Sequence, residues 1–151
     1  MESPTAEQTE RRDWMGVLAR APAVDLARLW ADWGQAPDFA WLRPPETGTV
    51  MLRGRAGGTG APFNLGEMTV TRAALRLGCG TVGHAWVQGR DRTKAETAAL
   101  VDALMQTAAA EALRARIIVP LRAAEEARRA GRARKAAATQ VEFFTMVRGE
   151  G

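Results

Sequence analysis

The segment from Arg53 to Arg72 carries five glycines within twenty residues, more than one connection in a packed domain needs. Each glycine costs backbone entropy, so glycines concentrate where φ is positive or where another molecule approaches the backbone. Arginines lie at both ends of the segment, and guanidinium groups bind carboxylates and phosphates. We therefore predict contact with an anion here; a wide hairpin loop without a ligand is the alternative. The candidate residues are Arg53, Arg55, Gly57, Gly58, Gly60, Asn64, Glu67 and Arg72.

Length and composition indicate one domain, residues 1–151, with one core. No uncharged apolar run reaches about 18 residues, so we expect no membrane span. Acidic Glu2 and Glu7 near the N-terminus argue against a secretion signal, and one cysteine fits a reducing, cytoplasmic setting. A single cysteine, Cys79, and a single histidine, His84, also argue against a metal site formed by this chain alone.

Apolar periodicity predicts an α+β domain. Helical spacing covers two N-terminal segments, around Trp14–Ala21 and Leu26–Trp33, with Gly34 as a C-terminal cap. An irregular connection through Pro37, Pro44 and Pro45 is expected next. Residues 93–96 have capping-box spacing for a long helix through Leu113, which Pro120 ends or kinks. A second, arginine-rich helix is expected to about residue 138. The predicted strands are residues 49–55, 67–77, 82–88 and 139–147.

These elements predict a mostly antiparallel sheet of about four strands, with the N-terminal and C-terminal helices packed on it. Residues 78–81 read as the hairpin turn between the second and third strands. Phe143 and Phe144 are adjacent in the last predicted strand, so their side chains would point to opposite faces. Either helices on both faces or a partner subunit would then have to cover them.

The glycine-rich segment matches no common nucleotide-binding fingerprint. It has neither the Gly-Lys-Ser/Thr of a P-loop nor the Gly-x-Gly-x-x-Gly of a dinucleotide fold. Arg53 and Arg55 lie on the same face of a predicted strand, about 7 Å apart. Two guanidinium groups at this distance could bind neighbouring phosphates, or they could protect a solvated strand edge by their charge, and we weigh the two interpretations equally. Asn64 could order the turn, and Glu67 could orient an arginine or a sugar hydroxyl.

Two further positions complete the candidates. His84 alternates with Trp86 on the third predicted strand, where a core role is expected first and general acid or base chemistry second. Arg90 or Asp91 is expected to cap the start of the long helix, where Asp91 suits the helix dipole. An anion could dock at the same place.

Several long runs resemble the PhnG family. They are residues 53–72, 83–91 and 138–150, together with residues 12–15 and the Leu42-Arg43 pair ahead of Pro45-Glu46, and they span nearly the whole chain in order. The family pattern usually has a cysteine after the Thr71-Arg72 pair, where this chain has Ala73. The resemblance implies a small, non-redox subunit of the carbon–phosphorus lyase system. In that family the G subunit assembles with I, H and J subunits, aided by the L protein.

The complex implied by the resemblance transfers the ribose 5-triphosphate of ATP to methylphosphonate and releases adenine. ATP would then be a substrate of the complex, and no cofactor is implied for this chain alone. We hypothesise that residues 53–72 lie at the interface with the I subunit, near the substrate phosphates. Two alternatives stay open: a purely structural adaptor, and a nucleic-acid-binding domain suggested by the pI of about 10.5. The placement of the aromatic residues in helical core patterns argues against the second.

Overall fold

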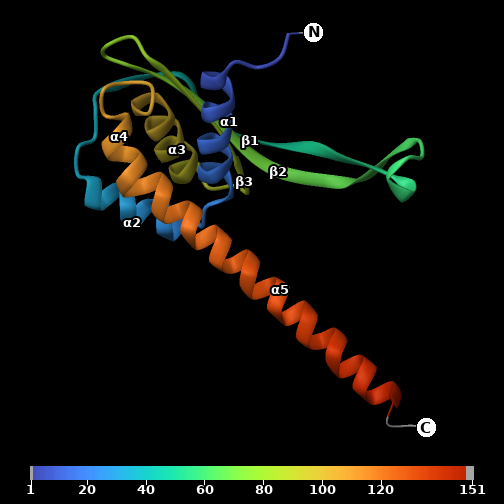
Figure 1. Ribbon diagram of the computed structural model, residues 1–151. Coiled ribbons are helices and arrows are strands. Elements are labelled where there is room, and N and C mark those ends of the chain that lie inside the picture. The colour runs from blue at the N-terminus through green and yellow to red at the C-terminus, as the bar shows by residue number, and fades with distance from the viewer. Residues whose placement is uncertain (1, 149–151) are drawn as a thin grey trace.

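The computed structural model describes residues 2–148, with the side chains of residues 2–139 (Figure 1). The α+β class is confirmed. The elements, in chain order, are α1 (Ala6–Arg20), α2 (Ala23–Trp33), β1 (Phe39–Arg55), a 3-10 turn (Ala56–Gly58), β2 (Pro62–Leu77), β3 (Val82–Gln88), α3 (Arg92–Leu104), α4 (Ala110–Leu113), a π-helical segment (Arg114–Ile118) and α5 (Val119–Arg148). No helix of the described residues is both long and apolar enough to cross a membrane.

The sheet is antiparallel with strand order β1-β2-β3. Alternate residues of β3 are buried against α3, where Gly83 lies close to the backbone of Ala99 and to Ala103. Helix α1 packs beside β3, and α2 and the π-helical segment complete the core. Leu18, Leu26, Leu75, Leu113, Ile117 and Ile118 are its largest fully buried apolar side chains. The helices therefore cover one face of the sheet and its β3 edge.

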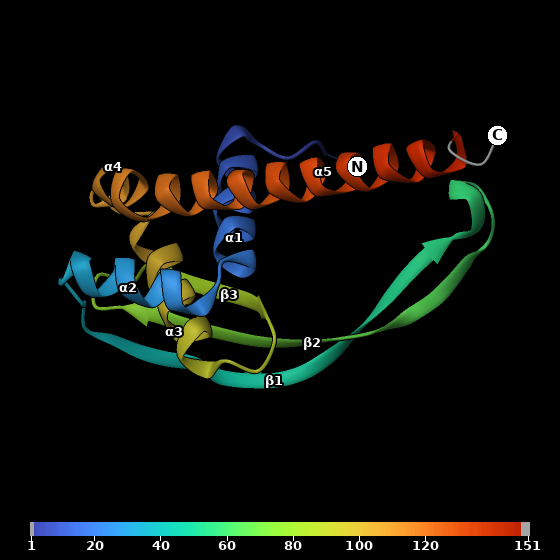
Figure 2. The same ribbon diagram turned by 90° about the horizontal axis from the view of Figure 1, so that it is seen from below.

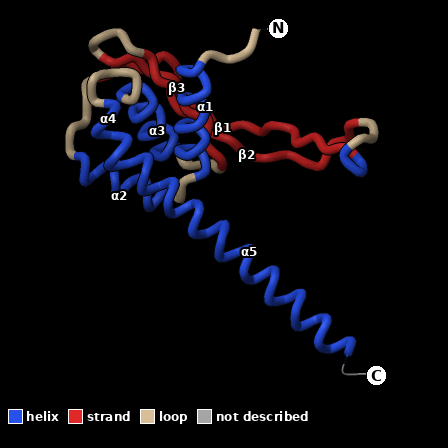
Figure 3. Tube along the Cα trace, viewed as in Figure 1, coloured by secondary structure: helices blue, strands red, loops and turns tan. Residues whose placement is uncertain are grey.

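Strands β1 and β2 are much longer than β3. The pairing of β2 with β3 ends at Val70 and Gln88, and beyond it β1 and β2 continue alone to the 3-10 turn. We call residues 49–69 the hairpin arm. The arm and α5 both leave the helical body on the same side (Figures 1 and 2). They diverge in the view of Figure 1, and in the view of Figure 2 the arm curves toward the level of α5. The red and tan trace of Figure 3 shows the arm as an isolated ribbon of two strands.

The prediction of a fourth strand at residues 139–147 is wrong, because these residues continue α5 and the sheet has three strands. Alanine and arginine, which favour helices, dominate residues 123–138, and no glycine or proline stops the helix at Ala138. A strand also needs a neighbour to pair with, whereas a helix satisfies its own backbone. The side chains of Phe143 and Phe144 lie outside the described residues, so the argument from their two faces no longer applies.

The irregular connection predicted at residues 37–45 is wrong over most of its length. Strand β1 begins at Phe39 and includes Pro44 and Pro45. Proline cannot donate to a sheet ladder, but β1 is an edge strand, and its register shifts between Trp41 and Arg43 and again between Arg43 and Glu46. These irregularities accommodate the two prolines within the strand.

The C-terminal helices also differ from the prediction. Of the predicted caps, Asp91 and not Thr93 caps α3, by accepting a hydrogen bond from the Lys94 backbone. Helix α3 ends at Leu104, before Leu113. Pro120 does not end a helix, because the chain stays helical from Ala110 through Pro120 into α5. It lies in the first turn of α5, directly after the π-helical segment, where a residue without an N–H is tolerated. Gly34, with φ of 67°, caps α2 as predicted.

Candidate functional site

The predicted site residues fall in separate places. Six of them, Arg53, Arg55, Gly57, Gly58, Gly60 and Asn64, lie at or beside the tip of the hairpin arm. Glu67 lies along the arm opposite Met51, and Arg72 pairs in register with Glu46 and Trp86 in the body. Arg90 is exposed in the connection from β3 to α3. Six residues of β1 lie between Glu46 and Arg53, a distance of about 23 Å along the strand, so the tip and Arg72 cannot bind one phosphate.

The backbone conformation at the tip of the arm requires glycines. Gly57 and Gly58 have φ values of 62° and 79°, which disfavour residues with a side chain. Gly60 has no such φ, but its N–H donates to the Ala56 carbonyl at 2.9 Å, and a Cβ there would crowd that oxygen. The glycines therefore form a tight turn, as the hairpin alternative requires.

Charged and apolar side chains share the exposed tip. Arg53 lies opposite Asn64 in the register, both arginines of the tip are exposed, and neither has a salt bridge among the described residues. Phe63 and Leu65 on β2 are 47% and 63% exposed. The tip therefore presents two unpaired guanidinium groups beside apolar surface that this chain leaves uncovered.

A second exposed cluster lies on the sheet face opposite α3. Trp86 of β3 is 51% exposed, and the Arg72 guanidinium lies 5.7 Å from its ring centroid. Arg72 donates from Nε and Nη2 to one oxygen of Glu46, at 3.3 and 3.2 Å. Arg43 donates to the same oxygen at 3.3 Å. Both arginines of this face are therefore already partly neutralised by one carboxylate.

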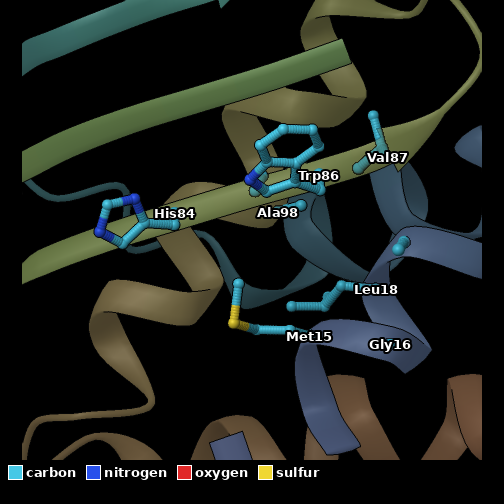
Figure 4. Close-up of a pocket in the computed structure, with 9 residues that line it drawn as sticks. Met15, Gly16, Leu18, His84, Trp86, Val87 and Ala98 are labelled. Atoms are coloured by element: carbon cyan, nitrogen blue, oxygen red, sulfur yellow. The ribbon is translucent and has the colours of Figure 1, made fainter. Parts of the chain in front are cut away.

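On the other side of Trp86, a recess of about 450 Å³ opens between α1 and β3. Figure 4 shows an adjoining pocket of about 220 Å³, in which His84 and Trp86 project from β3 and Met15 of α1 lies beside the strand. The lining residues are Gln8, Arg11, Arg12, Met15, His84 and Trp86. Arg12 is exposed and has no salt bridge within the described part of the chain. The recess is thus bordered by cationic and aromatic groups.

A buried carboxylate that the sequence prediction missed links the two elements that border this recess, α1 and β3. Asp102 of α3 is fully buried. It accepts hydrogen bonds from Arg11 Nε and Nη2 at 3.1 and 2.8 Å, and from Trp14 Nε1 at 2.8 Å. It also accepts from the backbone N–H of His84 at 2.8 Å. These bonds join α1, α3 and β3, and the hydrogen bond to Asp102 raises the pKa of Arg11.

The signal for Asp102 was present in the sequence. It interrupts the apolar helical run from Ala98 to Leu104, and a carboxylate there must be buried with donors. Its two side-chain partners, however, lie 88 and 91 residues away along the chain, so spacing alone could not identify them.

The chain matches the family model described as "Phosphonate metabolism protein PhnG" over residues 9–149. It is also 48% identical over 152 residues to the "Alpha-D-ribose 1-methylphosphonate 5-triphosphate synthase subunit PhnG" of Rhizobium meliloti (strain 1021). That alignment covers 98% of this chain and 95% of the relative. The chain belongs to the PhnG family. The resemblance inferred from the residue runs is confirmed.

Membership in the PhnG family, a family of phosphonate metabolism proteins, assigns no role to an individual side chain here. The imidazole of His84 has no hydrogen-bond partner among the described side chains, so its catalytic role stays a prediction. Within the same part of the chain, no three His, Cys, Asp or Glu residues gather in a way that could hold a metal ion. The structure therefore leaves two candidate surfaces, the arm tip and the face around Trp86.

Proposed function

We propose that this chain is a non-redox subunit of a complex that transfers ribose 5-triphosphate from ATP to methylphosphonate and releases adenine. The observation that carries the proposal is the 48% identity, over almost the full length of both chains, to a subunit named for that product. The proposed partners are the I-type, H-type and J-type subunits, with an L-type protein assisting. ATP is a substrate of the complex, and the chain alone has no cofactor and is inactive. The proposed location is the cytoplasm.

The shape of the molecule supports a role within an assembly. The hairpin arm and α5 project from the body, and α5 carries exposed side chains from Ala127 to Ala130 and from Arg132 to Thr139 (Figure 1). A two-stranded ribbon alone in water is marginally stable, and most helical stability comes from tertiary packing. Projections of this kind gain stability when another protein packs against them.

Within such a complex, we propose that the arm tip contacts the I-type subunit close to the substrate phosphates. Eight arginines form salt bridges among the described residues, in pairs such as Arg20 with Glu125 and Arg122 with Asp13. Arg53 and Arg55 have no such partner among the described residues. Unpaired guanidinium groups on an extended arm can reach a polyphosphate held by a neighbouring protein.

A purely structural adaptor is the second candidate, because the tip also exposes Leu52, Phe63 and Leu65. Exposed apolar side chains of this kind favour protein docking over phosphate binding. The salt bridges of eight arginines argue against the third alternative, a nucleic-acid-binding domain, which needs a continuous basic surface.

A double variant, Arg53→Ala with Arg55→Ala, separates these functions in the co-expressed complex. A phosphate-contact subunit keeps its assembly in size-exclusion chromatography but loses product formation, measured by phosphorus NMR, by about tenfold or more. An adaptor loses assembly and activity together. Unchanged assembly and unchanged activity would show that the tip arginines serve neither role. The matched control is Arg28→Ala with Arg92→Ala, which removes two exposed arginines from helices of the body.

A further inference from the structure

The two edges of the sheet differ in whether side chains of this protein bind their outward-facing backbone groups. At the β3 edge, the His84 N–H donates to Asp102 Oδ2, and the Val82 carbonyl accepts from Gln106 Nε2 at 2.9 Å. Side chains thus satisfy outward-facing backbone groups at this edge, and α1 lies beside it. Unpaired edge groups invite pairing with another chain, and natural proteins commonly cover or interrupt them. The β3 edge is closed in this way.

The hydrogen bonds at β3 also fix which backbone groups of β1 point outward. Because the His84 N–H points away from β2, His84 and its register partner Ala74 do not exchange backbone hydrogen bonds. Even-numbered residues of β2 therefore point their backbone groups toward β1. The odd-numbered residues point toward β3, as the bond from Gly89 N–H to the Thr69 carbonyl, at 2.9 Å, also shows.

The register between β1 and β2 then determines which backbone groups of β1 point toward β2 and which point outward. Gly48 and Val50 lie opposite Val70 and Met68, so they exchange hydrogen bonds with β2. The N–H and carbonyl groups of the residues between and beside them then point away from the sheet. These residues are Thr47, Thr49 and Met51. We call residues 46–52 the open edge.

The open edge has none of the protection found elsewhere in the sheet. Pro44 and Pro45 interrupt the earlier part of β1, but residues 46–52 contain neither proline nor lysine. No side chain of the described residues donates a hydrogen bond to their backbone or accepts one from it. Thr47, Thr49 and Val50 are β-branched, which favours an additional paired strand.

We propose that the open edge binds an extended segment of a partner protein, which adds a fourth strand to the sheet beside β1. This proposal rests on the proposed membership of a multi-subunit complex. Backbone hydrogen bonds to Thr47, Thr49 and Met51 would supply the pairing, as in other cases of strand addition. In this proposal, the partner segment carries carboxylates at the end that lies beside Arg53 and Arg55, because cross-strand pairs of opposite charge are favourable. Its remaining side chains are apolar on the face shared with Val50 and Leu52, which are incompletely buried.

A second copy of this chain fits the open edge poorly. Antiparallel self-pairing that overlaps the whole edge places Thr49 opposite Thr49. It then sets Arg53 opposite Pro45, which has no N–H, and Arg55 opposite Arg43. Like charges directly opposite each other are destabilising, and a proline removes a ladder hydrogen bond. An acidic partner segment meets neither obstacle.

Residue-resolved amide hydrogen exchange, on the full chain alone and in the co-expressed complex, tests the proposal. In the isolated chain the amides of Thr47, Thr49 and Met51 exchange rapidly, whereas those of Gly48 and Val50 are protected. In the complex the three outward amides slow by about tenfold or more, because they become hydrogen-bonded. If the complex assembles but these three amides stay fast, the added strand does not exist, while the proposed function stands. If no complex forms, or only a homodimer does, both proposals fail.

A proline at the centre of the open edge provides a second test. Thr49→Pro removes one outward N–H without removing a bond to β2, and it weakens assembly by about tenfold. The control, Thr49→Val, keeps the N–H and the β-branched shape and assembles normally. Equal assembly of the two variants would overturn the proposal. If Thr49→Pro alone loses its native circular dichroism spectrum, the exchange pattern of the unsubstituted complex decides.

Discussion

Strands β1 and β2 form both the helix-backed sheet and the hairpin arm, but the two regions are stabilised differently. In the body, Leu75 of β2 is fully buried beneath the helices, and the neighbouring Ala73 and Leu77 are almost as inaccessible. Ten residues before Leu75 on the same strand, Leu65 is 63% exposed. Both leucines lie on β2, but Leu75 pairs with Trp41, whereas Leu65 lies at the register shift between the Leu52–Gly66 and Arg53–Asn64 pairs. The two leucines therefore differ in both burial and backbone pairing.

This difference indicates where the molecule supplies its own core and where it needs another. Burial of apolar area is the main favourable term in folding, and the arm obtains little of it from this chain. The base of α5 is fastened to the body by pairs such as Glu125 with Arg20 and Arg128 with Asp25. Substitutions in the body should therefore change the stability of the isolated chain, whereas substitutions in the arm should act on assembly.

The largest expected effect is at Asp102. Asp102→Ala leaves Arg11, Trp14 Nε1 and the His84 N–H without their shared acceptor, and breaking a buried ion pair costs about 3–5 kcal/mol. Urea denaturation of the isolated chain measures the loss. Glu10→Ala is the control, because Glu10 is 64% exposed and lies 4.0 Å from its partner Arg114. A loss below about 1 kcal/mol in both variants would contradict a structural role for the buried carboxylate.

The two leucines of β2 give the next contrast. Leu75→Ala removes a fully buried side chain and should cost about 2–5 kcal/mol in the free energy of unfolding. Leu65→Ala should change that free energy by no more than about 0.5 kcal/mol, because Leu65 is exposed. Thermal or urea unfolding of the isolated chain measures both. Equal losses would mean that the arm is packed in solution and that the two regions do not differ.

The same division explains which elements the sequence could predict. Helical spacing around Trp14 and Leu26 and the turn at residues 78–81 depend on local pattern and were predicted correctly. The extra strand at residues 139–147 was predicted from β-branched and aromatic content, which does not decide between strand and helix without a partner. The length of β1 was underestimated because its prolines are tolerated only at an edge, and edge position is a property of the whole sheet.

For the candidate site, local pattern identified the tip and missed the network in the body. Glycines and arginines near residue 55 marked an exposed turn, which the structure contains. Their spacing could not show that Arg72 is far from that turn, nor that it stacks on Trp86. Asp102 was overlooked because its three donors come from α1 and β3, elements that only the tertiary fold brings together.

Substitution of one glycine in the body and one in the arm should again have different effects on stability, but smaller ones than the substitutions above. A Cβ at Gly83 would lie 2.7 Å from Ala103 Cβ and would also meet the Ala99 carbonyl, so the backbone of α3 would have to move. We expect Gly83→Ala to cost about 1–3 kcal/mol, with a corresponding fall in the thermal midpoint. A Cβ at Gly54 would also meet an atom at 2.7 Å, but that atom belongs to the exposed side chain of Leu65, which can turn away. A fall in midpoint for Gly54→Ala as large as that for Gly83→Ala would show that the arm is rigidly packed.

The smallest effect is expected where α5 leaves the body, and it depends on pH. The hydrogen bond from Arg20 lowers the pKa of Glu125 below its ordinary value near 4.5. The folded state therefore binds this proton more weakly than the unfolded state does. Its contribution to stability is present above about pH 4.5 and is lost as the pH falls through the lowered value.

Glu125→Gln should accordingly lower the urea midpoint at pH 7, and the difference from the unsubstituted chain should shrink as the pH falls through the lowered pKa of Glu125. The adjacent Glu126→Gln is the matched control, since Glu126 is exposed and has no salt bridge among the described residues. If both variants show the same pH dependence, the Arg20–Glu125 pair does not fasten α5 to α1. The base of α5 would then resemble the arm, and the boundary between the region that the chain packs for itself and the region that it offers to a partner would move toward Leu121.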